Sequence, residues 1–287
     1  MALTRKQESE GTVRIAPAAS IPAVIRELGF DPAEILEVAG ISPGIFDNPD
    51  NLISFRERSH LFAVCARKTG CDHFGLLVGE RAGLREFGLV GYLVKHSANV
   101  GTALASLVRY FHLHGQGSLV LVDEEEDVAF LGYGVYQEGV EALGQLTDAA
   151  VAIAFNMMRD LCGREWKPLE VSFSHGRHAD IRPYRRFFNT TLRFNTQRNG
   201  VYFPAEWLDR PVLGADAELH RLLEQQVEKV EAEFHQDFPD QVRQVLRVAI
   251  LTRHAGIEYL AGMFSIHSRT LRRRLGEYGT SFQELLD

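Results

Sequence analysis

The hydrophobic period changes along this chain, and the change limits the folds that are open to it. From Ser20 to Arg81 the pattern is helical, and two segments, "IPAVIRELG" and "DPAEILEVAG", each end on a glycine. Further apolar-periodic segments follow, the second from about Val100 to His112. The period then shortens, and "GSLVLVDEEEDVAFLGYGVY" predicts two strands joined in a hairpin by the acidic turn Asp123 to Asp127.

The segment after this hairpin returns to a helix and then to strands. A long helix is predicted from about Val140 to Cys162, because apolar side chains recur at spacing four. "PLEVSFSH" predicts another strand, and "TLRFNTQRNGVYFP" predicts a second hairpin whose turn holds Asn199 and Gly200. The sequence therefore predicts an α+β domain over residues 15–212, preceded by a mobile tail at residues 1–14.

A connecting helix is predicted next, over residues 213–238. The segment from Ala217 to Phe234 contains no glycine or proline and carries a narrow apolar stripe. The stripe consists of Leu219, Leu223, Val227, Val230 and Phe234. Such a helix either forms a homodimer as a short coiled coil or packs on its own domain, and the pattern leaves both open.

Length and composition indicate a globular chain of about two domains, with 287 residues of which 45% are hydrophobic. The longest apolar stretches, such as Ala149 to Phe155, fall far short of the roughly 18 residues that a membrane span requires. We therefore expect no membrane partner. Cys65, Cys71 and Cys162 form no CxxC pair, which predicts free thiols in a reducing cytoplasm.

The residues that could carry chemistry do not predict an enzyme. His112 and His114 have no third ligand at metal spacing, and His175 and His178 are predicted to be loop or hydrogen-bonding residues. The run Asp123 to Asp127 is most simply a solvated turn. The sequence contains no phosphate-binding glycine loop, nucleophile elbow or HExxH motif. We expect no catalytic site, no metal and no other cofactor.

Positive charge is concentrated at the C-terminal end of a chain whose net charge is −7. Residues 241–287 hold seven arginines and four acidic residues, a balance of +3, which leaves −10 for the rest. A basic patch on an acidic body is typical of polyanion binding, because the local field attracts phosphates. The C-terminal end is therefore a candidate nucleic-acid interface.

Three short helices predict an all-α helix-turn-helix segment within residues 239–287. Ile257, Leu260, Ala261 and Phe264 form the inner face of the second helix. In the third, "SIHSRTLRRRL", the apolar anchors are Ile266, Leu271 and Leu275. A rotation of about 100° per residue turns the arginines outward. The predicted DNA-binding residues are Ser268, Arg269, Thr270, Arg272, Arg273 and Arg274.

The same stretch resembles the first helix-turn-helix of the AraC/XylS family of bacterial transcription regulators. The matching residues are Arg269, Thr270, Leu271, Arg273, Leu275, Gly279, Ser281 and Phe282. Two body segments, "FGLVGYLVKHSANVGTALASLVRYF" and "YRRFFNTTLRFNTQRNGVYFPAEWLDRPV", are similar to the ligand-sensing domain of the family's ornithine-utilisation branch. The resemblance implies an α+β effector-binding domain, with double-stranded DNA, RNA polymerase and a small effector as partners. The effector classes that it implies are amino acids, amines, organic acids and lipids.

Two departures from the family pattern bear on this reading. His267 stands where the family usually has a capping serine, so the cap either moves to Ser268 or is weakened. Family members carry two helix-turn-helix units, and "TSFQELLD" matches only the start of the joining helix, so we expect the second unit to be absent.

The resulting expectation is a ligand-responsive regulator, and the alternative is a dimerisation or interaction module that does not bind DNA. Four residues between predicted elements are candidate effector contacts: Tyr110, His112, Tyr133 and Phe155. A closed, mostly apolar cavity, large enough for a metabolite, is expected between Ser20 and Pro211.

Overall fold

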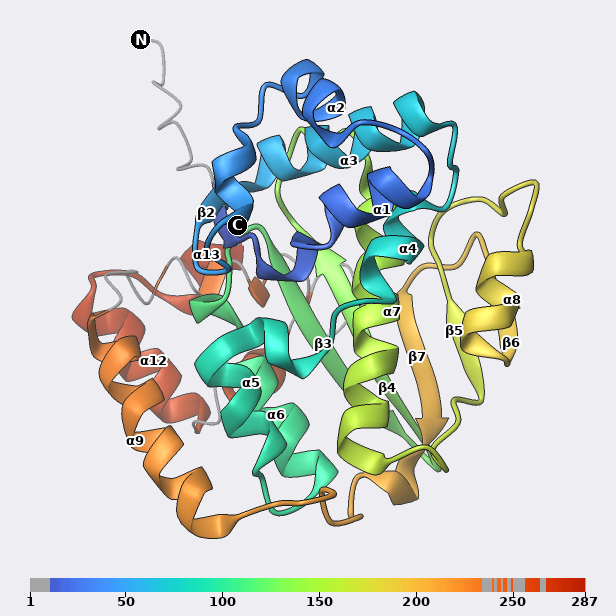
Figure 1. Ribbon diagram of the computed structural model, residues 1–287. Helices are drawn as coiled ribbons and strands as arrows, with labels where there is room; N and C mark the ends of the chain where they lie inside the picture. Colours follow the sequence, from blue (N-terminus) through green and yellow to red (C-terminus); the bar gives the residue numbers. More distant parts are fainter. Residues whose placement is uncertain are drawn as a thin grey trace, which may run out of the picture.

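The fold is mixed α and β, followed by short helices, as the sequence predicts (Figure 1). The computed structural model describes residues 11–233, 239, 242–243, 245–246, 249, 256–263 and 267–286. Its first layer is helical and carries a small two-stranded sheet. The elements of this layer are β1 (Thr12–Arg14), η1 (Ala16–Ala18), α1 (Ile21–Glu27), α2 (Pro32–Val38), η2 (Pro43–Phe46), β2 (Leu52–Ser54), α3 (Phe55–Thr69) and α4 (Phe74–Gly79).

The second layer is built around a five-stranded sheet. Helices η3 (Leu84–Phe87), α5 (Gly88–Lys95), α6 (Val100–Tyr110) and η4 (Phe111–Leu113) lead into it. Its strands and their connections are β3 (Ser118–Glu125), β4 (Val128–Val135), α7 (Leu143–Cys162), β5 (Glu170–Ser172), α8 (Arg182–Phe188), β6 (Thr191–Arg193), β7 (Asn199–Pro204) and η5 (Ala205–Trp207). The predicted hairpin is confirmed, because β3 and β4 pair antiparallel over their full length.

The second predicted hairpin is wrong. The strand order is β3-β4-β7-β5-β6, so β5 lies between β6 and β7 and pairs parallel with β6. Gly200 is inside β7, opposite Gly132 of β4. A Cβ on Gly200 would lie 2.3 Å from the backbone oxygen of Leu131, so the glycine permits a close strand approach rather than a turn.

Part of the segment predicted as a mobile tail, residues 1–14, is an ordered strand. Residues 12–14 form β1, which pairs antiparallel with β2 from Leu52 to Ser54. Val13 and Ile15 are fully buried, which explains why this segment is held in place. Residues 1–10 lie outside the described residues.

Helix α7 joins the two layers (Figure 1). Leu146 and Ala149 pack into the core of the N-terminal helices, whereas the part from Val151 to Leu161 packs into the core above the sheet. Helix α4 approaches α7 closely, because a Cβ on Gly79 would lie only 2.4 Å from the backbone oxygen of Ala149. The two helices therefore touch through backbone, which holds the layers in a defined relation.

The connecting helix α9 (Ala217–Glu233) lies beside α5. Val227 is fully buried, and Leu223 packs against the same core, so this part of the stripe packs on its own domain. Leu219 and Val230 remain exposed, and Phe234 lies outside the described residues. Within the described residues, no helix is both long and apolar enough to cross a membrane.

The C-terminal helices have a core of their own. They include α11 (Ile257–Met263), α12 (Ser268–Glu277) and α13 (Phe282–Leu286). The buried side chains are Val242, Leu246, Ala249, Ile257, Leu260, Ala261, Leu271 and Leu275. The inward positions predicted for Leu271 and Leu275 are confirmed, whereas Phe264 and Ile266 lie outside the described residues.

Candidate functional site

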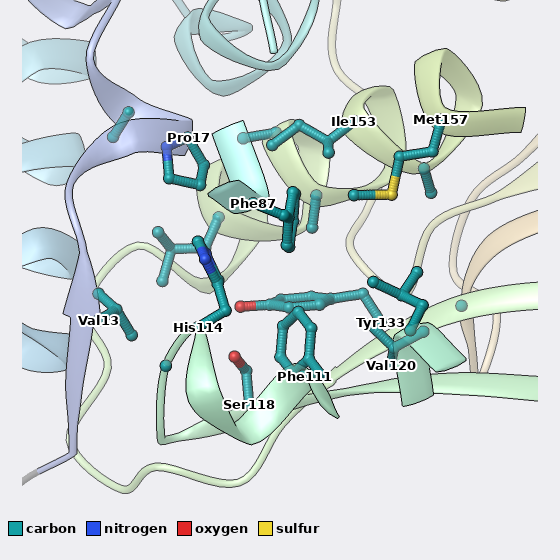
Figure 2. Close-up of a pocket in the computed structure, with 18 of the residues that line it drawn as sticks. Val13, Pro17, Phe87, Phe111, His114, Ser118, Val120, Tyr133, Ile153 and Met157 are labelled. Atoms are coloured by element: carbon teal, nitrogen blue, oxygen red, sulfur yellow. The ribbon is translucent and has the colours of Figure 1, made fainter. Parts of the chain in front are cut away.

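A mostly apolar cavity lies where the two layers meet (Figure 2). Its volume is about 70 Å³, several times the roughly 10–15 Å³ that one buried water needs. Helix α7, strands β3 and β4, and helices η3 and η4 supply most of the wall. The main apolar lining residues are Pro17, Phe62, Phe87, Leu107, Phe111, Val120, Leu131, Leu146, Ile153 and Met157. Val13 of β1 also lines the cavity, although its segment was assigned to the tail.

One end of the cavity is polar. Figure 2 shows the hydroxyls of Ser118 and Tyr133 pointing to the side where His114 lies, away from Met157. Arg58 of α3 also lines the cavity. Burial, followed by the positive charge of Arg58, lowers the pKa of His114 to about 3, so its imidazole is neutral at physiological pH. The cavity thus has one apolar and one polar end.

Of the four predicted effector contacts, only Tyr133 lines this cavity. Tyr110 is buried beneath the guanidinium of Arg109, which lies 4.7 Å from its ring centroid. Phe155 belongs to an aromatic cluster with Trp166 and Phe188 above the sheet. Both residues lie on helix faces that turn away from the cavity, which a helical pattern alone does not distinguish.

His112 also lies outside the cavity wall, but it lies between the cavity-lining residues of its own segment and helix α9. It belongs to η4, whose neighbouring residues Phe111 and His114 do line the cavity. Its Nε2 lies 3.7 Å from the carboxylate of Glu231 on α9, and Arg109 lies 4.0 Å from the same carboxylate. One short helix therefore contacts the cavity on one side and the connecting helix on the other.

Sequence reasoning missed Arg58 as a cavity residue. A signal was present, because Arg58 falls in the apolar stripe of α3 that includes Phe55, Phe62 and Cys65. A charged residue within a buried stripe indicates a special role. No local sequence pattern predicts that Val13 reaches the cavity, because its position depends on the pairing of β1 with β2.

His175 and His178 meet at a buried carboxylate that sequence reasoning also missed. Asp148 of α7 is fully buried, and its two oxygens lie 2.7 Å from His175 Nε2 and 2.6 Å from the Tyr184 hydroxyl. Burial alone would lower the pKa of His175, but the hydrogen bond and charge of Asp148 raise it above the ordinary value.

These side chains include the types that bind metals. Ligand-type atoms of Asp148, His175 and His178 lie within 4.8 Å of one another. Each carboxylate oxygen already has a hydrogen-bond partner, His175 or Tyr184, so the cluster has a structural explanation: it ties α7 to the segment after β5.

The predicted DNA-binding residues lie together on α12. Arg269, Arg272, Arg273 and Arg274 are exposed, while Leu271 and Leu275 are fully buried, as the helical period predicts. Ser268 and Thr270 are half-buried at the start of the helix. Arg273 forms an ion pair with Glu277 one turn later. The exposed face of α12 is thus strongly basic.

The cap of this helix did not move to Ser268. His267 is the N-cap, and its Nδ1 accepts a hydrogen bond from the backbone N–H of Arg269 at 3.2 Å. Imidazole supplies the acceptor that serine provides in other caps. Ser281 and Glu284 form a reciprocal cap at the start of α13.

Comparison with known proteins gives a consistent assignment. Residues 29–212 match the family model described as the arabinose-binding domain of AraC transcription regulator, N-term. The chain is 27% identical over 298 residues to the ornithine utilization regulator of Pseudomonas aeruginosa, which covers 98% of this chain and 84% of that protein. It is 27% identical over 267 residues to the HTH-type transcriptional regulator VirS of Mycobacterium tuberculosis, which covers 92% of this chain and 78% of that protein.

The crystal structure of transcriptional regulator CdpR from Pseudomonas aeruginosa has a similar fold. The TM-score is 0.50 and the identity 20%, over 91% of this chain and 81% of that chain. Its fold agrees with the family match, which alone spans more than half of the chain. The chain therefore belongs to the AraC family of transcription regulators, through its arabinose-binding N-terminal domain.

Proposed function

We propose that this chain is a ligand-responsive, DNA-binding transcription regulator. The cavity where the two layers meet binds a small effector, and the exposed face of α12 binds the major groove of DNA. The observation that carries the proposal is the pairing of an apolar cavity with one polar end and a basic helix that has its own buried core. The family match and the helix-turn-helix relatives support the same division into an effector-binding domain and a DNA-binding end.

The route from cavity to DNA runs through η4. Phe111 and His114 contact the effector, while His112 lies against Glu231 of the connecting helix. An effector that shifts η4 changes this contact and thereby the position of α9. It can do so only by binding one arrangement better than the other, and a coupling of about 1–3 kcal/mol is ordinary.

The DNA-binding part of the proposal is tested by fluorescence anisotropy with duplexes from upstream of the protein's own gene. Affinity should fall steeply with salt, because phosphate contacts release counterions. The double variant Arg269→Ala/Arg272→Ala should bind about tenfold or more weakly, and each lost phosphate contact should reduce the salt slope by about one. Arg67→Ala is the matched control, since Arg67 is an exposed arginine on α3.

A salt-independent affinity, or equal effects of the α12 and α3 variants, would reject DNA binding through α12. The rival function is a protein-interaction module, favoured by the exposed Leu219, Leu222 and Val230 on α9. In that case sedimentation should show a dimer that Leu222→Asp disrupts, and the α12 arginines should have no effect on it.

A further inference from the structure

Among the described residues, Arg58 is a buried cation without a counter-charge. The residue is only 8% exposed, and its Nε has no hydrogen-bond partner. Within the described part of the chain, no carboxylate forms an ion pair with its guanidinium, which instead lies 4.7 Å from the ring centroid of Phe55. Buried charges are ordinarily paired, because removing an isolated charge from water is unfavourable. The guanidinium is therefore available to an anion that enters the cavity.

The surroundings of Arg58 favour an anion. Arg58 is the fourth residue of α3, where the positive end of the helix dipole disfavours a cation and favours a negative charge. It lines the cavity together with His114 and Ser118, which are also buried. The imidazole of His114 is neutral because burial and the charge of Arg58 lower its pKa. The other nearby arginine, Arg14, is already paired with Asp50.

The remaining lining restricts the rest of the ligand. It is almost wholly aliphatic and aromatic, and it contains no aspartate or glutamate among the described residues. The ammonium group of an amine or amino acid would therefore enter the cavity without a counter-charge. A single unpaired guanidinium matches a single negative charge, and its planar fork fits a carboxylate.

We propose that Arg58, His114 and Ser118 form an anion subsite, and that the effector is a monocarboxylate with an apolar body. The carboxylate pairs with Arg58, the neutral imidazole and the Ser118 hydroxyl are placed to hydrogen-bond it, and the apolar body extends towards Val120 and Met157. This inference rests on the proposed function, because it names the chemical class of the effector in the same cavity.

The test is isothermal titration calorimetry on the full chain with octanoate, octanol and octylamine, which share a chain length and differ in charge. The wild-type protein should bind octanoate about tenfold or more tightly than octanol, as expected for a charge-assisted hydrogen bond, and octylamine most weakly. Arg58→Met should abolish this preference. Arg67→Met, the exposed arginine control on the same helix, should keep it.

A second readout protects against misfolding of the variant. Removal of a buried, unpaired charge should leave the melting temperature of the ligand-free Arg58→Met protein equal to or above that of the wild type. Octanoate should then raise the melting temperature of the wild type but not of Arg58→Met. Arg58→Lys keeps the charge and should retain part of the preference for octanoate.

The proposal is overturned if octanol binds the wild type as tightly as octanoate, if Arg58→Met keeps the preference, or if none of the three probes binds. The proposed function fails separately. If octanoate binds through Arg58 but DNA affinity does not change, the subsite stands and the regulatory role does not. If only the neutral probe changes DNA affinity, the regulatory role stands and the subsite does not.

Discussion

Leu271 is the side chain that most directly ties the basic helix to its support. It is fully buried between α12 and α11, where it meets Leu260 and Ala261. Replacing it with alanine should lower the free energy of unfolding of these helices by about 3 kcal/mol, the usual loss for a fully buried leucine. A core as small as the one formed by the C-terminal helices supplies only about 3–5 kcal/mol. Leu271→Ala should therefore unfold this segment for much of the time and abolish DNA binding.

The two tryptophans make the effect local and measurable. Trp166 and Trp207 are the only tryptophans in the chain, and both lie before α9. In the Leu271→Ala variant, their fluorescence should show that the N-terminal domain unfolds at the same urea concentration as in the wild type. Hydrogen exchange of α12 amides should meanwhile become about 100-fold faster, since every 1.4 kcal/mol is tenfold.

Arg272→Ala is the control for the loss of DNA binding without loss of local structure, because Arg272 is exposed on the same helix. It should weaken DNA binding and leave the exchange of α12 amides unchanged. If Leu271→Ala lowers the free energy of the unfolding transition seen by tryptophan fluorescence by the same amount, about 3 kcal/mol, the C-terminal helices are not a separate cooperative unit. If exchange in α12 stays slow, Leu271 does not anchor the helix.

Three further perturbations test other parts of the structure. Glu231→Gln should leave the effector affinity nearly unchanged but reduce the response of DNA affinity to effector, whereas Glu218→Gln on the same helix should not; equal responses in the two variants would exclude the route through η4. The folded-state pKa of His175 is raised by Asp148, so its stabilising contribution is present below the ordinary value of 6.5 and is lost as pH rises through the raised value. The urea stability difference between wild type and His175→Gln should therefore shrink with rising pH, and a difference that grows would contradict this sign. Gly79→Ala should lower the free energy of unfolding by about 1–3 kcal/mol, because its Cβ would lie 2.4 Å from a backbone oxygen of α7; an unchanged urea midpoint would show that α4 can move away.

Local patterns were sufficient where the chain interacts mainly with itself nearby. The hairpin of β3 and β4, the long helix α7 and the inward positions of Leu271 and Leu275 all follow from periodicity within one segment. The acidic stretch from Asp123 to Asp127 was predicted as a turn, but its first three residues belong to β3, and Glu126 has positive φ in the turn itself. Asp123 also pairs with Arg198 across the sheet.

The strand order and the cavity could not be predicted in this way. Strand β5 pairs with both β6 and β7, although β6 and β7 are the neighbours in sequence, and no short-range pattern encodes that choice. The predicted contacts Tyr110 and Phe155 were plausible by residue type but face other parts of the core.

By itself, the sequence determined the α+β class, the helix-turn-helix segment and its outward arginines, because each depends on the angle between residues a few positions apart. Only the tertiary structure decided which residues form the cavity. Val13, Arg58, His114, Tyr133 and Met157 come from five separate elements or their connections. Their meeting depends on how β1, α3, the sheet and α7 pack together, and packing over such distances leaves no periodic trace in the chain.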